Sequence, residues 1–289
     1  MPIPSDGLPD AALETRLDNL AVRLSALGSV LVAFSGGADS AFLLAAAVRA
    51  LGPSRVGAAT AVSASLARTE LAPAREFAAD LGVVHRTPAT SELERAGYRR
   101  NDGDRCAFCK SELLDVLIPL AAELGLSCVA TGTNADDAAA GFRPGIRAAR
   151  ERGALTPLLD AGLTKDQVRT ASRRWGLPTW DKPAAACLSS RIAYGIPITG
   201  SRLARVDRAE LALRAALDRA GIPVRDLRVR DLGDTARIEV DTSVTGQVAR
   251  CPAALGAVRA AGFTRVGVDP VGFRSGSMNE RLADPERYR

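Results

Sequence analysis

The sequence predicts an α/β fold, in which a parallel sheet carries helices on both faces and a small α+β domain follows. Short apolar runs alternate with longer helical patterns through the first two thirds of the chain, which is typical of strand–helix–strand units. After about residue 200 the pattern changes to a hairpin followed by a helix and one more strand. We therefore expect two domains, 1–199 and 200–289.

The first domain begins with a helix whose leucines recur at helical spacing, and strands and helices then alternate. A capping box, Thr164 with Gln167, opens the last helix of this series, which runs to Trp175. Residues 90–105 and 178–191 lack a clear period and are interpreted as loops. Strands are expected at 30–34, 55–62, 83–87 and 127–131, and helices at about 9–27, 41–50, 66–81 and 106–124, with a short helix after 143–145.

In the second domain, two strand patterns flank Gly233-Asp234, a dipeptide that favours a tight hairpin turn. The expected elements are a helix at 199–220, strands at 227–232 and 236–240, a helix at about 243–261 and a last strand at 265–269. Together they predict a small α+β unit that binds substrate or mediates oligomerisation.

Composition narrows the class of protein. The chain has 289 residues, and no apolar run approaches the ~18 residues of a membrane span. The N-terminal segment lacks the basic and apolar regions of a secretory signal, so we expect a cytoplasmic protein without a membrane partner. The net charge of +5 would suit an anionic ligand, but the arginines are spread along the chain and a nucleic-acid partner is not favoured. His85 is the one histidine, so neither a catalytic triad nor a histidine-rich metal site is expected.

The segment SGGADS, residues 35–40, lies between the first apolar run and a strong helix former. A helix N-terminus presents free backbone N–H groups and a positive dipole end, which together bind phosphate. Its two glycines permit close approach and a positive φ, and its two serines add hydroxyl donors. Asp39 suits such a site if Mg²⁺ bridges it to the phosphate oxygens. The other candidate nucleotide ligands in this loop are Ser35, Gly36, Gly37 and Ser40.

The loop is not a Walker A site, because none of the three lysines follows a glycine. SGGADS after an apolar strand resembles the PP-loop of ATP pyrophosphatases, which split ATP into AMP and pyrophosphate. GTNADD, residues 132–137, ends the fourth strand with paired carboxylates that suit metal–phosphate coordination, and an Asx turn that opens a helix is the alternative. Since ligands gather at the carboxyl ends of parallel strands, we also expect Ala61, Gly132, Thr133 and Asp136 at the nucleotide.

Five cysteines, an odd number, argue for thiol chemistry or metal rather than a disulfide framework. Cys106 and Cys109 begin a helix, where the helix N-terminus and the flanking Arg105 and Lys110 are expected to lower a thiol pKa. Two partly buried core cysteines are the alternative, because zinc needs four ligands and a second pair is missing. Cys187 lies in a loop between cations that favour its thiolate.

Arg228 and Arg230 alternate along a predicted strand and therefore share one face. Paired arginines bind phosphate or carboxylate through bidentate hydrogen bonds. We expect this pair to hold anionic groups of a substrate, and an ordinary solvated strand face is the alternative. Arg237 and Glu239 share a face of the partner strand.

Seven segments, in order along nearly the whole chain, resemble the LarE family of ATP-dependent sulfur transferases, which makes the nickel-pincer cofactor of lactate racemase. They are SGGADS, RCAFCK at 105–110, GTNADD, RPG at 143–145, ACLSSRIAYG at 186–195, RVR at 228–230 and RSGSMNE at 274–280. The resemblance implies that ATP adenylylates a carboxylate of pyridinium-3,5-biscarboxylic acid mononucleotide and that sulfur then displaces AMP. A homo-oligomer, and other nickel-pincer biosynthesis proteins as partners, are also expected.

The resemblance also assigns roles to residues. Cys187 matches the cysteine that supplies sulfur in sacrificial members, whereas Cys106, Cys109 and Cys187 match the three cysteines that hold a four-iron, four-sulfur cluster in other members. The Cys106–Cys109 pair favours the cluster, because the sacrificial route gives this pair no role. Ser190, Arg191, Arg228 and Arg230 are expected to bind substrate, and Glu210 and Glu239 are candidate metal ligands.

Two other functions stay open. A tRNA-thiolating enzyme would share the PP-loop and a cysteine cluster, although the additional cysteine pairs of zinc knuckles are missing here. A non-catalytic nucleotide-binding module is the second alternative, and the presence of both Asp39 and Cys187 argues against it. Pyrophosphate release would distinguish an enzyme from a non-catalytic nucleotide-binding module. Co-purification of tRNA would distinguish a tRNA-thiolating enzyme from a LarE-like sulfur transferase.

Overall fold

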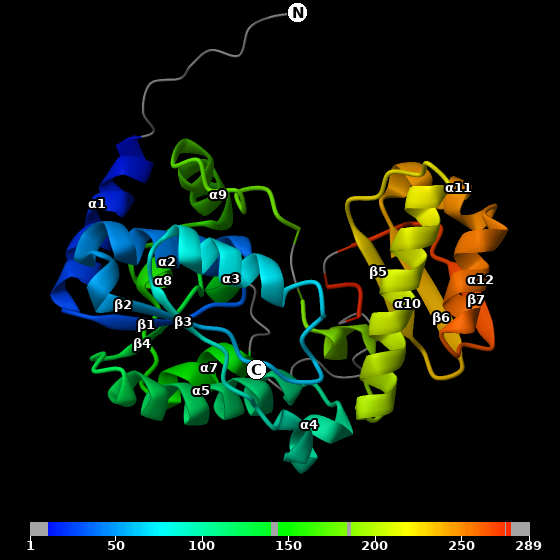
Figure 1. Ribbon diagram of the computed structural model, residues 1–289, viewed down its shortest axis with the longest axis horizontal. Coiled ribbons are helices and arrows are strands. Elements are labelled where there is room, and N and C mark those ends of the chain that lie inside the picture. Colours follow the sequence, from blue (N-terminus) through cyan, green and yellow to red (C-terminus); the bar gives the residue numbers. More distant parts are fainter. Residues whose placement is uncertain (1–10, 140–143, 184–185, 275, 279–289) are drawn as a thin grey trace, which may run out of the picture.

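The computed structural model describes residues 11–139, 144–183, 186–274 and 276–278. Within them, two separate sheets each carry their own helices (Figure 1). The predicted start of the first helix at residue 9, Arg143 and the end of the RSGSMNE segment lie outside these ranges.

The first sheet has four strands, all parallel, in the order β3-β2-β1-β4. The strands are β1 (Val30–Ala33), β2 (Val56–Ala59), β3 (Val84–Arg86) and β4 (Val129–Thr131). Val32 of β1 lies between Ala58 of β2 and Ala130 of β4. All three side chains are buried, as expected for central strands of a sheet that is covered on both faces. This sheet confirms the predicted fold class.

Helices cover both faces of the parallel sheet (Figure 1). The helices that surround it are α1 (Ala11–Ala26), α2 (Ala38–Leu51), α3 (Leu71–Asp80), α5 (Arg105–Glu123), α7 (Pro144–Glu151), α8 (Pro157–Asp160) and α9 (Lys165–Arg174). Two short helices, α4 (Ala96–Arg100) and α6 (Ala135–Ala139), complete this part of the chain, and α4 packs against α5. Helices α1, α2, α3 and α9 pack with Val30 and Val32 on one face. Helices α5 and α7 pack with Leu31 on the other face, because successive strand residues point to opposite sides.

Several elements of this domain differ from the predictions. Helix α2 begins at Ala38 rather than at residue 41, and α4 lies within the segment 90–105 that was interpreted as a loop. Helix α3 begins at Leu71 rather than at residue 66. Pro73 then falls in the first turn, where a missing backbone N–H is tolerated, whereas an earlier start would place it in the helix interior. Strand β2 ends at Ala59 rather than at residue 62, and the chain beyond it turns to line a cavity.

The second sheet has the order β5-β6-β7. Its elements are α10 (Gly200–Arg219), β5 (Leu227–Asp231), β6 (Thr235–Val240), α11 (Thr245–Ala249), α12 (Pro252–Ala260) and β7 (Arg265–Val268). Strands β5 and β6 form the predicted antiparallel hairpin, in which Gly233 takes a φ of +92°. Strand β7 pairs parallel to β6, and α10 and α12 pack together beside the sheet (Figure 1).

The prediction of a single helix at 243–261 is wrong, because the chain forms the two helices α11 and α12 instead. Pro252 is the first residue of α12, and Cys251 before it has an extended backbone. A proline disfavours the helical conformation in the residue before it, so the chain breaks there.

The core beneath the second sheet also receives side chains that precede residue 200. Leu188, Ile192 and Ile198 are buried in it together with Tyr98 of α4. The domain boundary after residue 199 stays a prediction. No helix in the described parts of the chain is both long and apolar enough to cross a bilayer.

Gly132 marks a close approach between the end of β4 and the start of α2. A Cβ atom at this position would lie 2.8 Å from the backbone nitrogen of Ser40. We expect Gly132→Ala to lower the free energy of unfolding by about 1–3 kcal/mol, as overpacking does. Gly256→Ala in α12 is the control, because nothing lies within 4 Å of its Cβ position and alanine favours helix. In denaturant unfolding, the change in free energy of unfolding should therefore be negative for Gly132→Ala and positive for Gly256→Ala. Equal midpoints for the two variants would contradict the close approach.

Candidate active site

The SGGADS loop joins β1 to α2, as predicted. Gly36 has a φ of +71°, which glycine adopts without strain. Gly37 was also expected to need a positive φ, but it is the N-cap of α2 with a φ of −80°. The Ser40 hydroxyl donates to the Gly37 carbonyl at 3.1 Å and lies 3.1 Å from the Ser35 hydroxyl. These bonds hold the loop against the N-terminus of a long helix, where an anion is favoured.

Asp39 lies in the first turn of α2 with an unsatisfied oxygen. Its Oδ1 is buried and no described residue donates to it, while its Oδ2 lies 3.4 Å from the Lys165 ammonium. A buried carboxylate oxygen without a partner is costly. Mg²⁺ prefers oxygen ligands of this kind, so Asp39 fits the predicted ion.

Two adjoining cavities open beside this loop. The strand-end cavity, of about 380 Å³, lies at the ends of β1, β2 and β4, and its lining includes Ala61 and Gly132. The inter-domain cavity, of about 550 Å³, is lined by the starts of α5 and α9 and by residues of the C-terminal part, among them Arg228 and Arg230. Both cavities are lined by Ser35, Gly37, Asp39, Lys110, Thr133, Asp137, Ala186 and Cys187.

In the GTNADD segment, the carboxylate at the cavity wall is Asp137, which lines both cavities. Asp136 was predicted in that role, but it is exposed and accepts a hydrogen bond of 2.7 Å from the backbone N–H of Lys165. This contact places Asp136 at the N-terminus of α9, where a carboxylate is stabilising.

The predicted cysteines gather around the two cavities. Cys187 lines both, Cys109 the strand-end cavity and Cys106 the inter-domain cavity. The expected lowering of thiol pKa is wrong for Cys109, because burial raises its pKa and the nearby Cys187 and Glu92 raise it further. Within the described ranges, no three acidic, histidine or cysteine side chains are close enough to hold a metal. Beyond the effect of burial, Cys187 and Cys106 both raise the pKa of Cys109, so the three thiols lie near one another, and the predicted iron–sulfur cluster stays a prediction.

Hydrogen bonds fix the loop that carries Cys187. The Ser190 hydroxyl donates to the Cys187 carbonyl at 2.7 Å. The buried Arg191 guanidinium donates to the same carbonyl at 3.0 Å and to the carbonyl of Ala186. Arg191 was predicted to bind substrate, yet it is absent from both cavity linings. Its contacts instead position the sulfur-bearing residue.

Comparison with known proteins decides the family. No family model matches the sequence. The chain is 42% identical over 274 residues to an uncharacterized protein of Synechocystis sp., covering 93% of this chain and 99% of that protein. It is 33% identical over 273 residues to the pyridinium-3,5-bisthiocarboxylic acid mononucleotide synthase of Lactiplantibacillus plantarum, covering 94% of this chain and 96% of that enzyme. The chain belongs to the LarE family.

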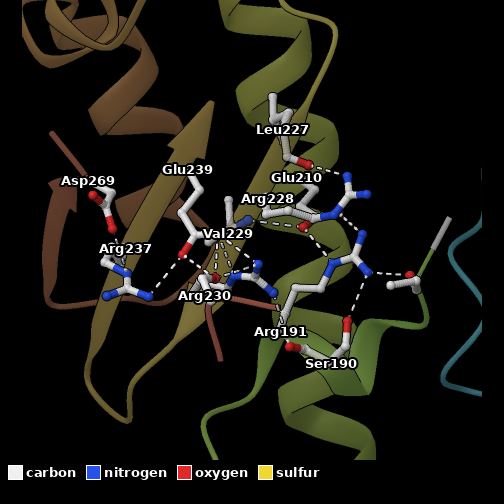
Figure 2. A network of polar contacts seen from close by, with 12 residues as sticks. Ser190, Arg191, Glu210, Leu227, Arg228, Val229, Arg230, Arg237, Glu239 and Asp269 are labelled. Carbon is white, nitrogen blue, oxygen red and sulfur yellow. Dashed lines mark hydrogen bonds and ion pairs between the residues drawn. The ribbon is translucent and has the colours of Figure 1, made fainter. Parts of the chain in front are cut away.

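In this LarE-family chain, arginines neutralise both carboxylates that were expected to bind a metal (Figure 2). Glu210 accepts from Arg191 at 3.0 Å. Glu239 is fully buried and accepts from Arg230 at 2.8 Å and from Arg237 at 2.9 Å. Since buried charges are retained when they are paired, these contacts explain both carboxylates without a metal.

Arg228 and Arg230 both line the inter-domain cavity, in contact with different groups. Arg230 is held by Glu239 and donates to the Ser190 carbonyl at 3.1 Å. Arg228 donates to the Leu227 carbonyl at 2.7 Å (Figure 2). Its guanidinium also lies over the Phe273 ring. Burial, and then the neighbouring Arg191, lower the pKa of Arg228 to about 10. An anion in the cavity would offset this repulsion.

The LarE-family site also contains two cations that the sequence analysis did not single out, Lys165 and Arg169, and it gives Lys182, expected beside the Cys187 thiolate, different contacts. Lys165 and Arg169 line the inter-domain cavity from the first turns of α9. Lys182 donates to the Gly36 carbonyl at 3.0 Å and to Glu70 at 2.7 Å, so it links its own loop, which leads to Cys187, to the SGGADS loop. The i, i+4 spacing of Lys165 and Arg169 at a helix N-terminus was the signal available. Nothing local in the sequence points to the contact of Lys182.

Proposed function

We propose that this LarE-family chain uses ATP to adenylylate a carboxylate of pyridinium-3,5-biscarboxylic acid mononucleotide and then replaces AMP with sulfur, in nickel-pincer cofactor biosynthesis. The observation that carries the proposal is the meeting of two cavities at Asp39 and Cys187. A nucleotide in one cavity and a carboxylate substrate in the other would react beside a thiol. The name of the Lactiplantibacillus relative, a bisthiocarboxylic acid mononucleotide synthase, supports the substrate class.

The number of positively charged lining residues supports a different ligand in each cavity. Among its described lining residues, the strand-end cavity has Lys110 as its single cation. The inter-domain cavity has seven, namely Arg105, Lys110, Lys165, Arg169, Lys182, Arg228 and Arg230. A mononucleotide with two carboxylates and a phosphate would bind in the cationic inter-domain cavity. The nucleoside of ATP would then occupy the strand-end cavity, with its phosphates at the N-terminus of α2.

The polar groups near the PP-loop suit release of pyrophosphate. Lys165 and Arg169 would neutralise the leaving phosphates. Asp39 would hold Mg²⁺, which when bound supplies charge neutralisation at the phosphoryl oxygens. Asp137, which lines both cavities, is a second candidate ligand.

Sulfur transfer is written through Cys187, because it is the cysteine that lines both cavities among the described residues. The Cys187 thiolate attacks the carbonyl carbon of the acyl-adenylate, a C–S bond forms and AMP leaves with the electrons of the C–O bond. A base then removes the Cα proton of Cys187. The Cβ–S bond breaks with its electrons on sulfur, which leaves a thiocarboxylate product and dehydroalanine in the chain.

Pyrophosphate release in the presence of ATP, Mg²⁺ and the biscarboxylic mononucleotide tests the adenylylation half. We expect AMP and pyrophosphate in equal amounts, formed only when the mononucleotide is present. ADP with inorganic phosphate as products would overturn the proposal. Pyrophosphate release that depends on tRNA, rather than on the mononucleotide, would favour the tRNA-thiolating alternative.

Arg228→Ala should weaken binding of the biscarboxylic mononucleotide. A lost charge-assisted hydrogen bond costs about 1.5–3 kcal/mol, so we expect Kd to rise at least about tenfold while ATP binding stays unchanged. Calorimetric titration measures both. Arg225→Ala is the matched control, because this exposed arginine precedes the same strand and lines neither cavity. An unchanged substrate Kd for the Arg228 variant would assign the pair an ordinary structural role.

A further inference from the structure

Glu92 is a buried acidic residue that the proposed reaction does not use. It begins a short 3₁₀ helix, Glu92–Glu94, between β3 and α4. Its side chain lines the strand-end cavity, although the residue is only 3% exposed. A carboxylate so deeply buried requires partners.

Two serine hydroxyls occupy one of its oxygens. Ser63 and Ser65 donate to Glu92 Oε1 at 2.5 and 2.6 Å, and their own hydroxyl oxygens are 2.9 Å apart. Among the described residues, no group donates to Oε2. The carboxylate is therefore held rigidly by one oxygen and has an acceptor left over in the cavity wall.

The part of a ligand that meets this acceptor must bring a hydrogen-bond donor and carry no negative charge. Small apolar side chains surround the same cavity, including Ala59, Ala61, Leu66, Ala67 and Leu113. This lining suits a flat heterocycle whose polar groups lie at its edge. The ring of the biscarboxylic mononucleotide does not meet this requirement, because its two carboxylates would bring negative charge and acceptors next to Glu92.

We propose that Glu92 accepts a hydrogen bond from the exocyclic amino group of adenine and thereby selects ATP over GTP and ITP. The inference rests on the proposed function, since it needs ATP in the strand-end cavity. Adenine presents an amino donor at its 6-position, whereas guanine and hypoxanthine present a carbonyl oxygen there. Two acceptors would then face each other, and a buried acceptor without a donor is costly.

The test measures binding of α,β-methylene triphosphates of adenosine, inosine and purine riboside, which cannot release pyrophosphate. With the unaltered protein, we expect the adenosine compound to bind at least about tenfold more tightly than the other two. Glu92→Gln keeps the shape and offers an amide that can donate. We expect it to weaken the adenosine compound and to strengthen the inosine compound, so that the preference shrinks or reverses.

Controls separate recognition of adenine from a structural role. Glu94→Gln, on the same 3₁₀ helix but exposed, should leave all three dissociation constants unchanged. If Glu92 only supports Ser63 and Ser65, Glu92→Gln will weaken all three compounds by the same factor, which overturns the proposal. The contact could instead be to ribose. In that case the 2′-deoxy or 3′-deoxy adenosine compound would bind more weakly than the adenosine compound, whereas the purine riboside compound would bind as tightly. That result would also overturn the proposal.

The outcome is distinguishable from failure of the proposed function. If the unaltered protein binds no adenosine compound, the ATP-dependent reaction fails together with this inference. If it binds the adenosine compound and releases pyrophosphate, but Glu92→Gln shows unchanged selectivity, only the role of Glu92 is wrong.

Discussion

Replacement of Cys187 by serine should abolish thiocarboxylate formation while substrate-dependent pyrophosphate release continues. A serine hydroxyl at this position cannot supply sulfur, so we expect product to fall by at least about 10³-fold. The SGGADS loop, Asp39 and the arginines of the inter-domain cavity do not depend on the thiol, so adenylylation should persist. Mass spectrometry of the nucleotide product and a pyrophosphate assay measure the two half-reactions separately.

The same experiment on the other two cysteines identifies the sulfur source. If Cys187 gives up its own sulfur, the Cys106→Ser/Cys109→Ser double variant still forms one thiocarboxylate per chain. The chain then loses the mass of one hydrogen sulfide at Cys187. Bound iron and sulfide after anaerobic purification, together with a double variant that makes no product, would contradict this and restore the cluster route. Matched folding of all variants, checked by thermal unfolding, excludes a general loss of structure.

Much of the fold could be predicted because its signals are local. The apolar run at residues 30–34, followed by small residues and a strong helix former, specifies strand, loop and helix from neighbouring residues alone. The Gly233-Asp234 hairpin and the Thr164 capping box are likewise determined within a few residues. The missed break at Pro252 was also readable, because proline disfavours helix in the residue before it.

The candidate site could be predicted only where the role of a residue follows from a local motif. It could not be predicted where the role depends on packing against distant segments. Whether Cys109 is a thiolate depends on burial and on Glu92, which is far from it in sequence, and helix position alone gave the wrong direction. Asp136 and Asp137 are neighbours with identical side chains, and only the packing of α9 decides which one reaches the cavities. Glu210 likewise carried no local sign that Arg191 would neutralise it. The shared strand face of Arg237 and Glu239, in contrast, did indicate their ion pair.

Replacement of Asp39 by asparagine should remove most of the pyrophosphate release. The substitution keeps the shape of the side chain and eliminates its charge, at the point where the two cavities meet. The buried Oδ1 would lose its ability to attract Mg²⁺, and the charge that faces Lys165 would disappear. Loss of one such electrostatic contact at a reacting phosphoryl group costs about 10²–10³ in rate. The stability cost should stay near 0.3–1 kcal/mol, the value of a carboxylate in the first turn of a helix.

Asp136→Asn is the matched control for Asp39→Asn, because Asp136 is an exposed carboxylate outside both cavity linings. The asparagine amide oxygen can still accept from the backbone N–H of Lys165, so this variant should lose about 0.3–1 kcal/mol of stability, as Asp39→Asn does, and keep its rate of pyrophosphate release. A Mg²⁺ titration adds a second readout, since the concentration needed for half-maximal rate should rise for Asp39→Asn and stay constant for Asp136→Asn. Equal losses of the pyrophosphate release rate in the two variants would place the phosphate-binding carboxylate elsewhere. An unaltered rate for Asp39→Asn would remove this residue from the reaction.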